Sequence, residues 1–415
     1  MPSISSAIPS PSAVQHSVAR ILLFALPVCA LTSAGGMALV QLLILILSLC
    51  WLRPLRAWYR ANWRQYRGIV LAFAGFFLVS AIRAAFHPKP WAALDGPLRV
   101  LLALTCIGFV AWARPSWREF IGGVCLGVLG AFLLALVQRL VIGMGRVDGY
   151  THHPITFGDL ALAMGVLALL ALPGWRAHRW LRLAPPAALL AGLAVSVLSG
   201  SRGGWLALPL LAAAPLLAGN WRLARQIGAL LAACALLFAL AWAVPASGVA
   251  ARVTLAATEA RGYIERQDAN TSVGIRLELW KASWLMFQQD PLLGVGRDRF
   301  RAELQTLAQS GQLQHSLALQ FSSSHNDALN MLATGGLLDF SCLLLLYGAP
   351  LLLFRRTLQR HAHGPQHDAG LAGILLVLCF IGFGLTDVMF WLMMPKVFYV
   401  MFVGVLAGYC LQEEA

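Results

Sequence analysis

The amino-acid sequence predicts an all-α integral membrane protein with about twelve transmembrane helices and one large loop. Three observations lead to this prediction. Hydrophobic residues make up 59% of the 415 residues and charged residues 12%, whereas soluble domains carry about 25% charged residues. Apolar segments of about 20 residues recur along the chain. A helix of this length crosses a bilayer. Basic residues gather in the short segments between them.

The apolar segments divide the chain into five regions. A disordered tail is expected at 1–17, nine spans within 18–245, a large loop containing short helices at 246–327, three spans within 328–411 and a tail at 412–415. The first span also resembles a signal peptide, whose removal would leave the other spans in the same orientation. The expected spans are 18–34, 37–52, 68–86, 97–113, 119–142, 155–173, 183–199, 203–219, 225–245, 328–354, 369–387 and 392–411.

The basic residues concentrate in alternate loops, which predicts the orientation of the chain. Cytoplasmic loops carry an excess of Lys and Arg, so these loops and both termini are expected to be cytoplasmic. The loop at 246–327 is then periplasmic, and its eight basic and eight acidic residues suit translocation. The largest basic groups are Arg53, Arg56, Arg60, Arg64 and Arg67 after the second span, Arg176, Arg179 and Arg182 after the sixth, and Arg355, Arg356 and Arg360 after the tenth.

Composition and missing motifs argue against several classes of protein. The net charge of +14 lies mostly in loops between apolar spans, where it serves topology, so nucleic acid is not an expected partner. All eight cysteines lie in apolar segments, which argues against a disulfide framework. The chain has no P-loop, no GxGxxG and no DxD sequence. No cofactor and no metal ion are therefore expected.

The segment Ser201-Arg202-Gly203-Gly204 is expected in a tight turn between the seventh and eighth spans. Arg202 falls on the predicted periplasmic side, where the positive-inside rule does not call for it. A helix that begins at Gly203 or Gly204 directs its N–H groups and positive dipole end beside the guanidinium. The combination predicts an anion site. The alternative is an arginine that caps a turn at the lipid headgroups.

Residues 272–289 are expected to form an amphipathic helix in the large loop, with Ser272 as its N-cap. Arg276 then lies in the first turn, where a cation opposes the helix dipole. Either a bound anion or a salt bridge to Asp or Glu would compensate this unfavourable interaction, and the sequence favours neither. The expected apolar face, directed to the membrane surface or to the helix bundle, contains Leu277, Trp280, Trp284 and Phe287.

Two further segments of the large loop carry polar candidates. Residues 322–324 are serines that are expected to cap the tenth span, which places His325 in its first turn. A histidine at the membrane surface is a candidate general base, although a single histidine is often structural. Asn326 lies beside it. The segment 290–300, which includes Arg297, is expected to be a turn and a short helix.

Several ionisable residues are expected within or near the spans, where charges are costly and usually functional. Asp159 follows His153 at the start of the sixth span, and Asp387 lies near the outer end of the eleventh. Arg139 lies in the fifth span, and Arg146 in the loop after it. The sequence does not identify which of these groups pair.

Together these segments resemble the landmarks of the O-antigen ligase family. The resemblance rests on Ser-Arg-Gly-Gly at 201–204, Gly-Ile-Arg-Leu-Glu-Leu-Trp at 274–280, Pro-Leu-Leu-Gly-Val-Gly at 291–296, His-Asn at 325–326 and the following run 329–336. Motif detail covers about 196–340, and one long periplasmic loop late in the chain fits as well. Asp339 departs from the family pattern, in which a small residue, Thr or Tyr is more usual.

The resemblance implies a bacterial inner-membrane glycosyltransferase. It would transfer O-antigen polysaccharide from undecaprenyl diphosphate to lipid A–core, without a metal and with inversion at the anomeric carbon. His325 would be the general base, and Arg202 and Arg276 would hold the diphosphate in an active site that faces the periplasm. Membrane lipids are further expected partners. Other expected substrate contacts are Asn326, Gly203, Trp280, His153, Arg146 and Arg297.

Two alternatives are open at this point. Within the same superfamily, the chain would be an O-antigen polymerase or a protein O-oligosaccharyltransferase. In a different class, it would be a flippase for lipid-linked glycans or another transporter. A transporter places its essential charges near the bilayer midplane, whereas Arg202, Arg276 and His325 are all predicted on the outer face.

Overall fold

The computed structural model describes residues 8–85, 90–171, 175, 180–219, 249–265 and 268–413, with a few short stretches between 224 and 243. The chain divides into two compact units. Unit 1 comprises Met1–Gly219, Leu345–Gly382 and Leu392–Ala415, and unit 2 comprises Asn220–Leu344 and Phe383–Trp391. Helix α16 (Asp327–Arg360) contributes its first half to unit 2 and its second half to unit 1.

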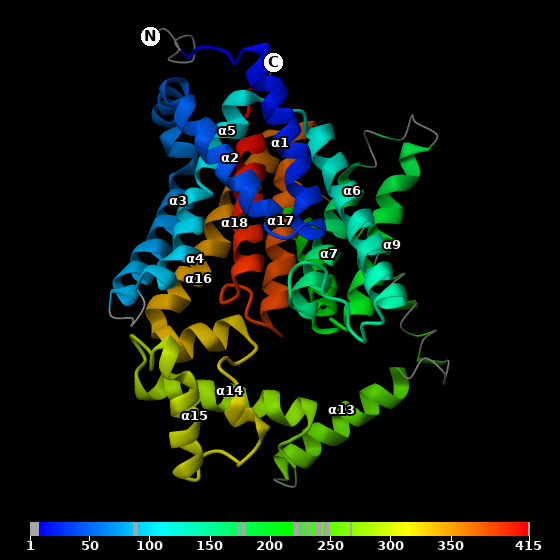
Figure 1. Ribbon diagram of the computed structural model, residues 1–415, viewed down its shortest axis with the longest axis vertical. Coiled ribbons are helices and arrows are strands. Elements are labelled where there is room, and N and C mark those ends of the chain that lie inside the picture. Colours follow the sequence, from blue (N-terminus) through cyan, green and yellow to red (C-terminus); the bar gives the residue numbers. More distant parts are fainter. Residues whose placement is uncertain are drawn as a thin grey trace. The chain divides into compact units, whose positions relative to one another are not determined.

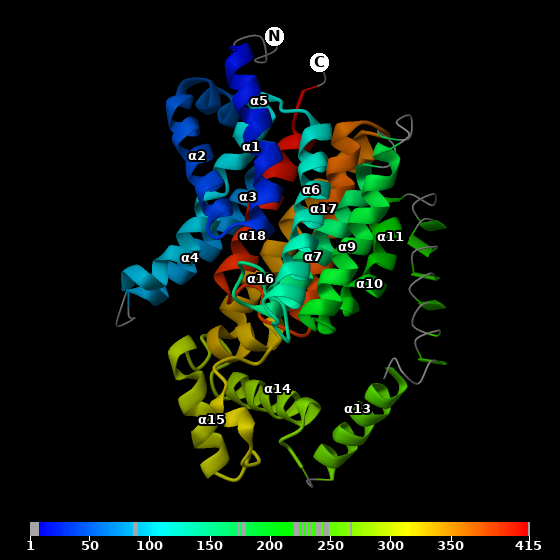
Figure 2. The ribbon, with the colours of Figure 1, turned by 45° about the vertical axis from the view of Figure 1, so that its right-hand side comes forward.

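Unit 1 is a bundle of apolar helices, with α17 and α18 running through its middle (Figure 1). Almost every residue of α18 is buried. The other helices surround this pair, as the rotated view also shows (Figure 2). The long elements of unit 1 are α1 (Ala13–Thr32), α2 (Gly36–Cys50), α3 (Leu52–Ala84), α4 (Pro90–Leu102), α5 (Thr105–Ala113), α6 (Trp117–Leu136), α7 (Pro154–Ala168), α9 (Ala184–Ser199), the second half of α16, α17 (Pro365–Gly384, of which 383–384 fall in unit 2) and α18 (Met393–Cys410).

Small residues let neighbouring helices of this bundle approach closely. A Cβ added to Gly127 of α6 would lie 2.5 Å from the carbonyl oxygen of Pro27 in α1. A Cβ added to Gly192 of α9 would lie 2.5 Å from that of Ala161 in α7. Membrane helices associate through such contacts because burial of apolar side chains gives little driving force inside a lipid bilayer.

Nine helices in the described part of the chain are long and apolar enough to cross a membrane, and two shorter apolar helices accompany them. These eleven segments coincide with eleven of the twelve expected spans, so the prediction of a multi-pass helical membrane protein is confirmed. The expected span at 225–245 lies largely outside the described residues, as do Arg176 and Arg179. The total of twelve and the periplasmic side of the large loop stay predictions.

Two element boundaries differ from the expected ones. Helix α1 begins at Ala13, inside the expected tail 1–17, because Ser12 and Gln15 form a capping box. Helix α3 begins at Leu52, so residues 53–67, expected as a loop, continue the helix beyond its apolar part. Arginine is a good helix former, which explains why a basic segment extends the helix.

The expected eighth span, 203–219, is a succession of short helical pieces. Pro209 and Pro215 each lack the backbone N–H that a continuous α-helix needs. The pieces are η5 (Gly203–Leu206), α10 (Ala207–Leu210), η6 (Leu211–Ala213) and α11 (Ala214–Ala218). Helix η5 begins at Gly203, as the sequence predicted.

Unit 2 contains α13 (Val249–Ile264), α14 (Ser272–Gln289), η8 (Arg297–Arg299), α15 (Phe300–Gln309), η9 (Leu317–Gln320) and the start of α16. Its core forms where α14 and α15 pack together. The buried residues include Leu279, Ala282 and Met286 of α14 and Phe300, Leu304 and Leu307 of α15.

The helix expected at 272–289 is confirmed, but the expected N-cap, Ser272, was wrong. Its N-cap is Thr271, whose hydroxyl accepts a hydrogen bond from the Gly274 N–H at 3.0 Å. On the expected apolar face, Trp284 is 49% exposed, and the direction of that face toward the membrane surface or the bundle stays a prediction. Helix α15 covers the opposite face of α14, and the sequence of α14 alone cannot show where α15 packs.

Candidate active site

His325 lies in unit 2, immediately before α16, in a strained backbone conformation. Its φ angle is +50°, in the left-handed region that residues other than glycine seldom adopt. Its ring packs edge-on against Phe321, with the ring centroids 5.3 Å apart. Strained residues of this kind cluster at functional sites because the surrounding structure must hold them in place.

Asp387 holds the histidine ring from the loop that follows α17. His325 Nδ1 lies 3.3 Å from Asp387 Oδ1, and the Asp387 side chain is only 1% exposed. A carboxylate can only accept a hydrogen bond, so in the neutral imidazole the tautomer that suits this contact donates from Nδ1–H and leaves the lone pair on Nε2. An imidazole oriented in this way can take a proton from a hydroxyl group. The Val388 N–H also donates to Asp387 Oδ1, at 2.9 Å, and fixes the carboxylate.

His325, Asn326 and Asp327 attach the 385–391 loop, which follows α17, to the start of α16. Besides the His325 contact, the Asn326 amide donates to the Leu385 carbonyl at 3.1 Å, and the Phe390 N–H donates to Asp327 Oδ1 at 3.2 Å. Asn326 also caps α16, because its Oδ1 accepts from the Leu329 N–H at 3.0 Å. The expectation of serine caps with His325 in the first turn was therefore wrong, and Asn326 has a structural role.

Arg297 is brought to the same loop. Its guanidinium carbon lies 4.1 Å from the centre of the Trp391 ring, a cation–π contact. Arg297 was predicted as a substrate contact, and this role stays a prediction. Trp391 itself had not been predicted.

The 291–296 turn replaces the hydrogen bonds that α16 loses where it breaks at Gly336. In a continuous helix, the N–H groups of residues 337 and 338 would donate to the carbonyls of residues 333 and 334. Here those N–H groups donate to the carbonyls of Pro291 and Leu292, at 2.8 and 3.3 Å. The carbonyls of residues 333 and 334 accept instead from the N–H groups of residues 295 and 296, at 2.9 and 3.1 Å. Four backbone groups on each segment are thus satisfied.

Two glycines make this exchange possible. Gly336 has φ +61° and ψ −158°, a conformation found almost only in glycine. A Cβ on Gly294 would lie 2.4 Å from the Gly335 nitrogen, and one on Gly336 would lie 2.4 Å from the Leu292 carbonyl carbon. The Pro-Leu-Leu-Gly-Val-Gly and Thr-Gly-Gly segments therefore fit each other and join the 291–296 turn to α16.

Arg276 and Trp280 lie on α14 of the same unit. Because α14 begins at Ser272, Arg276 is its fifth residue, slightly further from the helix end than expected. Its partly buried side chain makes no hydrogen bond or ion pair to any residue that the structure describes. The Trp280 indole nitrogen is sheltered and has no acceptor among those residues either. Glu278, between them, accepts from the Gln314 N–H at 2.5 Å and so connects α14 to the segment after α15.

In unit 1, the segment 199–204 forms a tight turn held by Asp159. The Ser201 hydroxyl donates to the Asp159 carboxylate, which is fully buried. A Cβ on Gly204 would lie 2.1 Å from Asp159 Oδ1, so only glycine allows the carboxylate this close. Asp159 thereby fixes the backbone on both sides of Arg202. The Arg202 side chain is exposed and has no hydrogen-bonding partner within the described residues.

The remaining predicted residues of unit 1 hold the surrounding loop. Arg146 donates to the Ser199 carbonyl at 2.8 Å and lies across Gly200. His153 caps α7, since its Nδ1 accepts from the Thr156 N–H at 3.4 Å. Arg139 donates to the carbonyls of residues 144 and 145. These contacts give the residues structural roles, and substrate binding by Arg146 and His153 stays a prediction.

The structure thus assigns the pairings that the sequence left open. Asp387 pairs with His325 and Asp159 with the Ser201 turn. Sequence reasoning had marked both carboxylates as costly within or near the spans. It contained no information about their partners, which lie 62 and 42 residues away along the chain.

These features define a class of protein, a multi-pass helical membrane protein with a histidine–carboxylate pair and with two arginines, Arg202 and Arg276, that have no hydrogen-bonding partner within the described residues. Comparison with known families makes the assignment more specific. Residues 186–344 match the model of the O-Antigen ligase family, and that range contains the 201–204 turn, α14, the 291–296 turn and His325. This segment therefore resembles that family, whose members are glycosyltransferase-like enzymes, as its motifs predicted.

A curated relative extends the similarity beyond the matched region. It is an uncharacterized protein of Haemophilus influenzae, 23% identical over 296 residues. The aligned segment covers 71% of this chain and 74% of the relative. The relative's description adds no activity or substrate.

Proposed function

We propose that this protein is an O-antigen ligase, which transfers a polysaccharide from undecaprenyl diphosphate to a hydroxyl group of lipid A–core. The observation that carries the proposal is the His325–Asp387 pair, at 3.3 Å, in a chain with the O-Antigen ligase signature. A lipid-linked sugar diphosphate is already activated. The protein needs only to deprotonate the acceptor and stabilise the leaving group.

His325 is the general base in this proposal. Its Nε2 takes the proton of the acceptor hydroxyl while the oxygen forms a bond to the anomeric carbon. The bond from that carbon to the diphosphate oxygen breaks, and its electron pair leaves with undecaprenyl diphosphate. A single displacement of this kind inverts the anomeric centre. Asp387 holds the neutral ring in the tautomer whose Nε2 accepts a proton, and it stabilises the imidazolium that forms.

Arg202 and Arg276 bind the diphosphate in this proposal. A guanidinium binds phosphate oxygens through two parallel N–H groups, and it would stabilise the charge that develops on the leaving group. The support is that both side chains lack a hydrogen-bonding partner within the described residues. They belong to different units, so the proposal requires that both reach one donor. Transfer rates of Arg202→Gln, Arg276→Gln and the double variant test this, because shared action on one diphosphate gives non-additive losses.

The proposed location is the inner membrane, with the 246–327 loop and the reacting groups in the periplasm and both termini in the cytoplasm. The support is the distribution of arginines between alternate loops. Reporter fusions test it. Alkaline phosphatase fused after residue 312 should be active, and the same enzyme fused after residue 412 should be inactive. The reverse pattern would overturn the orientation.

The decisive experiment uses purified protein, undecaprenyl-diphosphate-linked O-antigen and lipid A–core, with products separated by gel electrophoresis. Wild type should shift the glycan ladder onto lipid A–core, and His325→Ala should abolish the shift while the protein stays folded. His367→Ala, which removes the histidine of another His–Asp contact, is the matched control and should stay active. Longer donor-linked chains without transfer would identify a polymerase. No change in any glycan would favour a transporter.

A further inference from the structure

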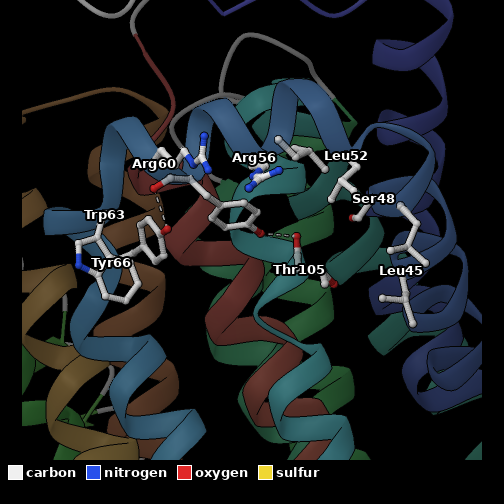
Figure 3. Close-up of a pocket in the computed structure, with 11 residues that line it drawn as sticks. Leu45, Ser48, Leu52, Arg56, Arg60, Trp63, Tyr66 and Thr105 are labelled. Atoms are coloured by element: carbon white, nitrogen blue, oxygen red, sulfur yellow. Dashed lines mark hydrogen bonds between the residues drawn. The ribbon is translucent and has the colours of Figure 1, made fainter.

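A cavity of about 520 Å³ lies in unit 1 between α2, α3 and the start of α5. Figure 3 shows apolar, basic, aromatic and hydroxyl side chains in its wall. Leu45, Leu49 and Leu52 form an apolar part, and the guanidinium groups of Arg56 and Arg60 lie together at one end. Its volume is in the range of small-molecule sites.

The two arginines are placed where a bound anion would stabilise them. They are four residues apart on α3, so they share a face of the helix. Like charges at this spacing, close to a helix N-terminus, are unfavourable. The cavity wall contains no acidic residue, and no Asp or Glu occurs in the chain before Asp95. Neither guanidinium has a hydrogen-bonding partner in the described ranges.

Ser48 provides an independent sign of a ligand. The residue is only 7% exposed and lines the cavity. Its hydroxyl group has no hydrogen-bond partner anywhere in the described residues. A serine in a helix usually donates to the carbonyl four residues earlier, and an unpartnered buried hydroxyl costs free energy. A polar atom of a ligand in the cavity would remove that cost.

The entrance of the cavity faces the apolar outer surface of the bundle. Leu49 and Leu52 line it and are 60% and 54% exposed. Trp63, which is 44% exposed, stands at the polar end, and tryptophan favours the membrane–water interface. A molecule that fits therefore has an apolar chain within the membrane and a negative group at the interface.

The cavity is far from the Arg202 turn within the same unit. Trp51, beside the cavity end of α3, stacks on Phe109 and Trp112 of α5, and α6 begins only five residues after Trp112. Helix α6 has 20 residues and is therefore about 30 Å long. The loop after it donates to Ser199 through Arg146, beside the Arg202 turn. A donor held at Arg202 cannot place its diphosphate at Arg56.

We propose that this cavity binds an anionic diacyl phospholipid, with an acyl chain along Leu45, Leu49 and Leu52 and the phosphate between Arg56 and Arg60. The Ser48 hydroxyl donates to an ester or phosphate oxygen of the same lipid. Basic pockets between transmembrane helices bind anionic headgroups by the same chemistry. This site is independent of the proposed transferase activity.

Native mass spectrometry of the full-length protein in detergent, titrated with phosphatidylglycerol, tests the proposal. The double variant Arg56→Gln/Arg60→Gln should bind about 30-fold more weakly, since each basic residue near an anionic lipid contributes about fivefold. Ser48→Ala should weaken binding about fivefold through one lost hydrogen bond. The matched control is Arg64→Gln/Arg67→Gln, two exposed arginines of the same helix that do not line the cavity, and it should bind as wild type does.

Three results would overturn the proposal. An equal loss in the control would mean that general surface charge attracts the lipid. Equal binding of phosphatidylcholine by wild type would exclude recognition of the anionic headgroup. Tighter, competing binding of undecaprenyl phosphate, with the same dependence on Arg56 and Arg60, would assign the cavity to the polyprenyl lipid. Thermal unfolding of each variant checks that a loss of binding is not a loss of fold.

Discussion

Replacing Asp387 by asparagine tests the proposed base most directly, because it removes a charge and preserves the shape of the side chain. The carboxylate lies 3.3 Å from His325 Nδ1 and is buried. Asparagine retains an oxygen that can accept from Nδ1–H and from the Val388 N–H. The variant therefore separates the electrostatic role of Asp387 from its role in holding the loop.

The expected loss follows from the distance. Two unit charges 3.3 Å apart attract by about 5 kcal/mol at an effective dielectric constant of about 20. If about half of the proton has reached His325 in the transition state, about 2.5 kcal/mol of that stabilisation is lost, which lowers kcat by roughly 10²-fold. A loss nearer 10⁴ would indicate that the amide N–H₂ faces the ring and selects the wrong tautomer.

Steady-state kinetics with purified protein measure the effect. Loss of a contribution made only in the transition state lowers kcat and leaves KM nearly unchanged. The matched control is Asp368→Asn, which changes the carboxylate of the other His–Asp contact, 3.2 Å from His367 Nδ1, and should retain wild-type kcat. Asp387→Asn with kcat within twofold of wild type would refute the base mechanism, and an equal loss in the control would show that the effect is not specific to the site.

Three further predictions address the arginine, the helix break and the role of metals. Arg202→Lys should lower kcat/KM at least tenfold, because a point charge does not replace a bidentate fork; full activity would leave Arg202 as a headgroup anchor. Gly336→Ala should lower the free energy of unfolding by more than about 3 kcal/mol, because it adds backbone strain and places a Cβ 2.4 Å from the Leu292 carbonyl carbon. Gly348→Ala is the control, since a Cβ there meets open space on the same helix, and it should be neutral or slightly stabilising. Transfer should persist in EDTA, and a loss that divalent ions reverse would contradict the metal-free mechanism.

Features set by local physics were predictable from the sequence. Bilayer thickness fixes the length of an apolar span, so eleven expected spans coincide with apolar helices. The turn at 201–204 and the helix at 272–289 were also predicted, because glycine runs and apolar periodicity are local signals. Arg202 and His325 stood out because a cation or an imidazole in such segments is unusual.

Features set by tertiary contacts were not predictable in this way. The sequence marked Asp387 as a costly carboxylate, but only the fold places it at His325. The buried face of α14 is decided by α15, which packs on Leu279, Ala282 and Met286 rather than on Trp284. Serine caps were expected at the start of α16, but Asn326 caps the helix instead. Its amide also donates to the Leu385 carbonyl, a contact between residues distant in sequence that the local sequence does not reveal.

The exchange of hydrogen bonds at Gly336 explains why the two glycine-containing segments at 291–296 and 334–336 occur together. A continuous α16 would need no partner segment, and the 291–296 turn would then be free to move. Because the helix is broken, four backbone hydrogen bonds join that turn to residues 333–338. Arg297 directly follows the turn and stacks on Trp391, while His325, Asn326 and Asp327 contact the 385–391 loop. The turn at 291–296 and the loop at 385–391 are thus both joined to the first half of α16 and to the residues just before it, one of which is His325 with its positive φ angle.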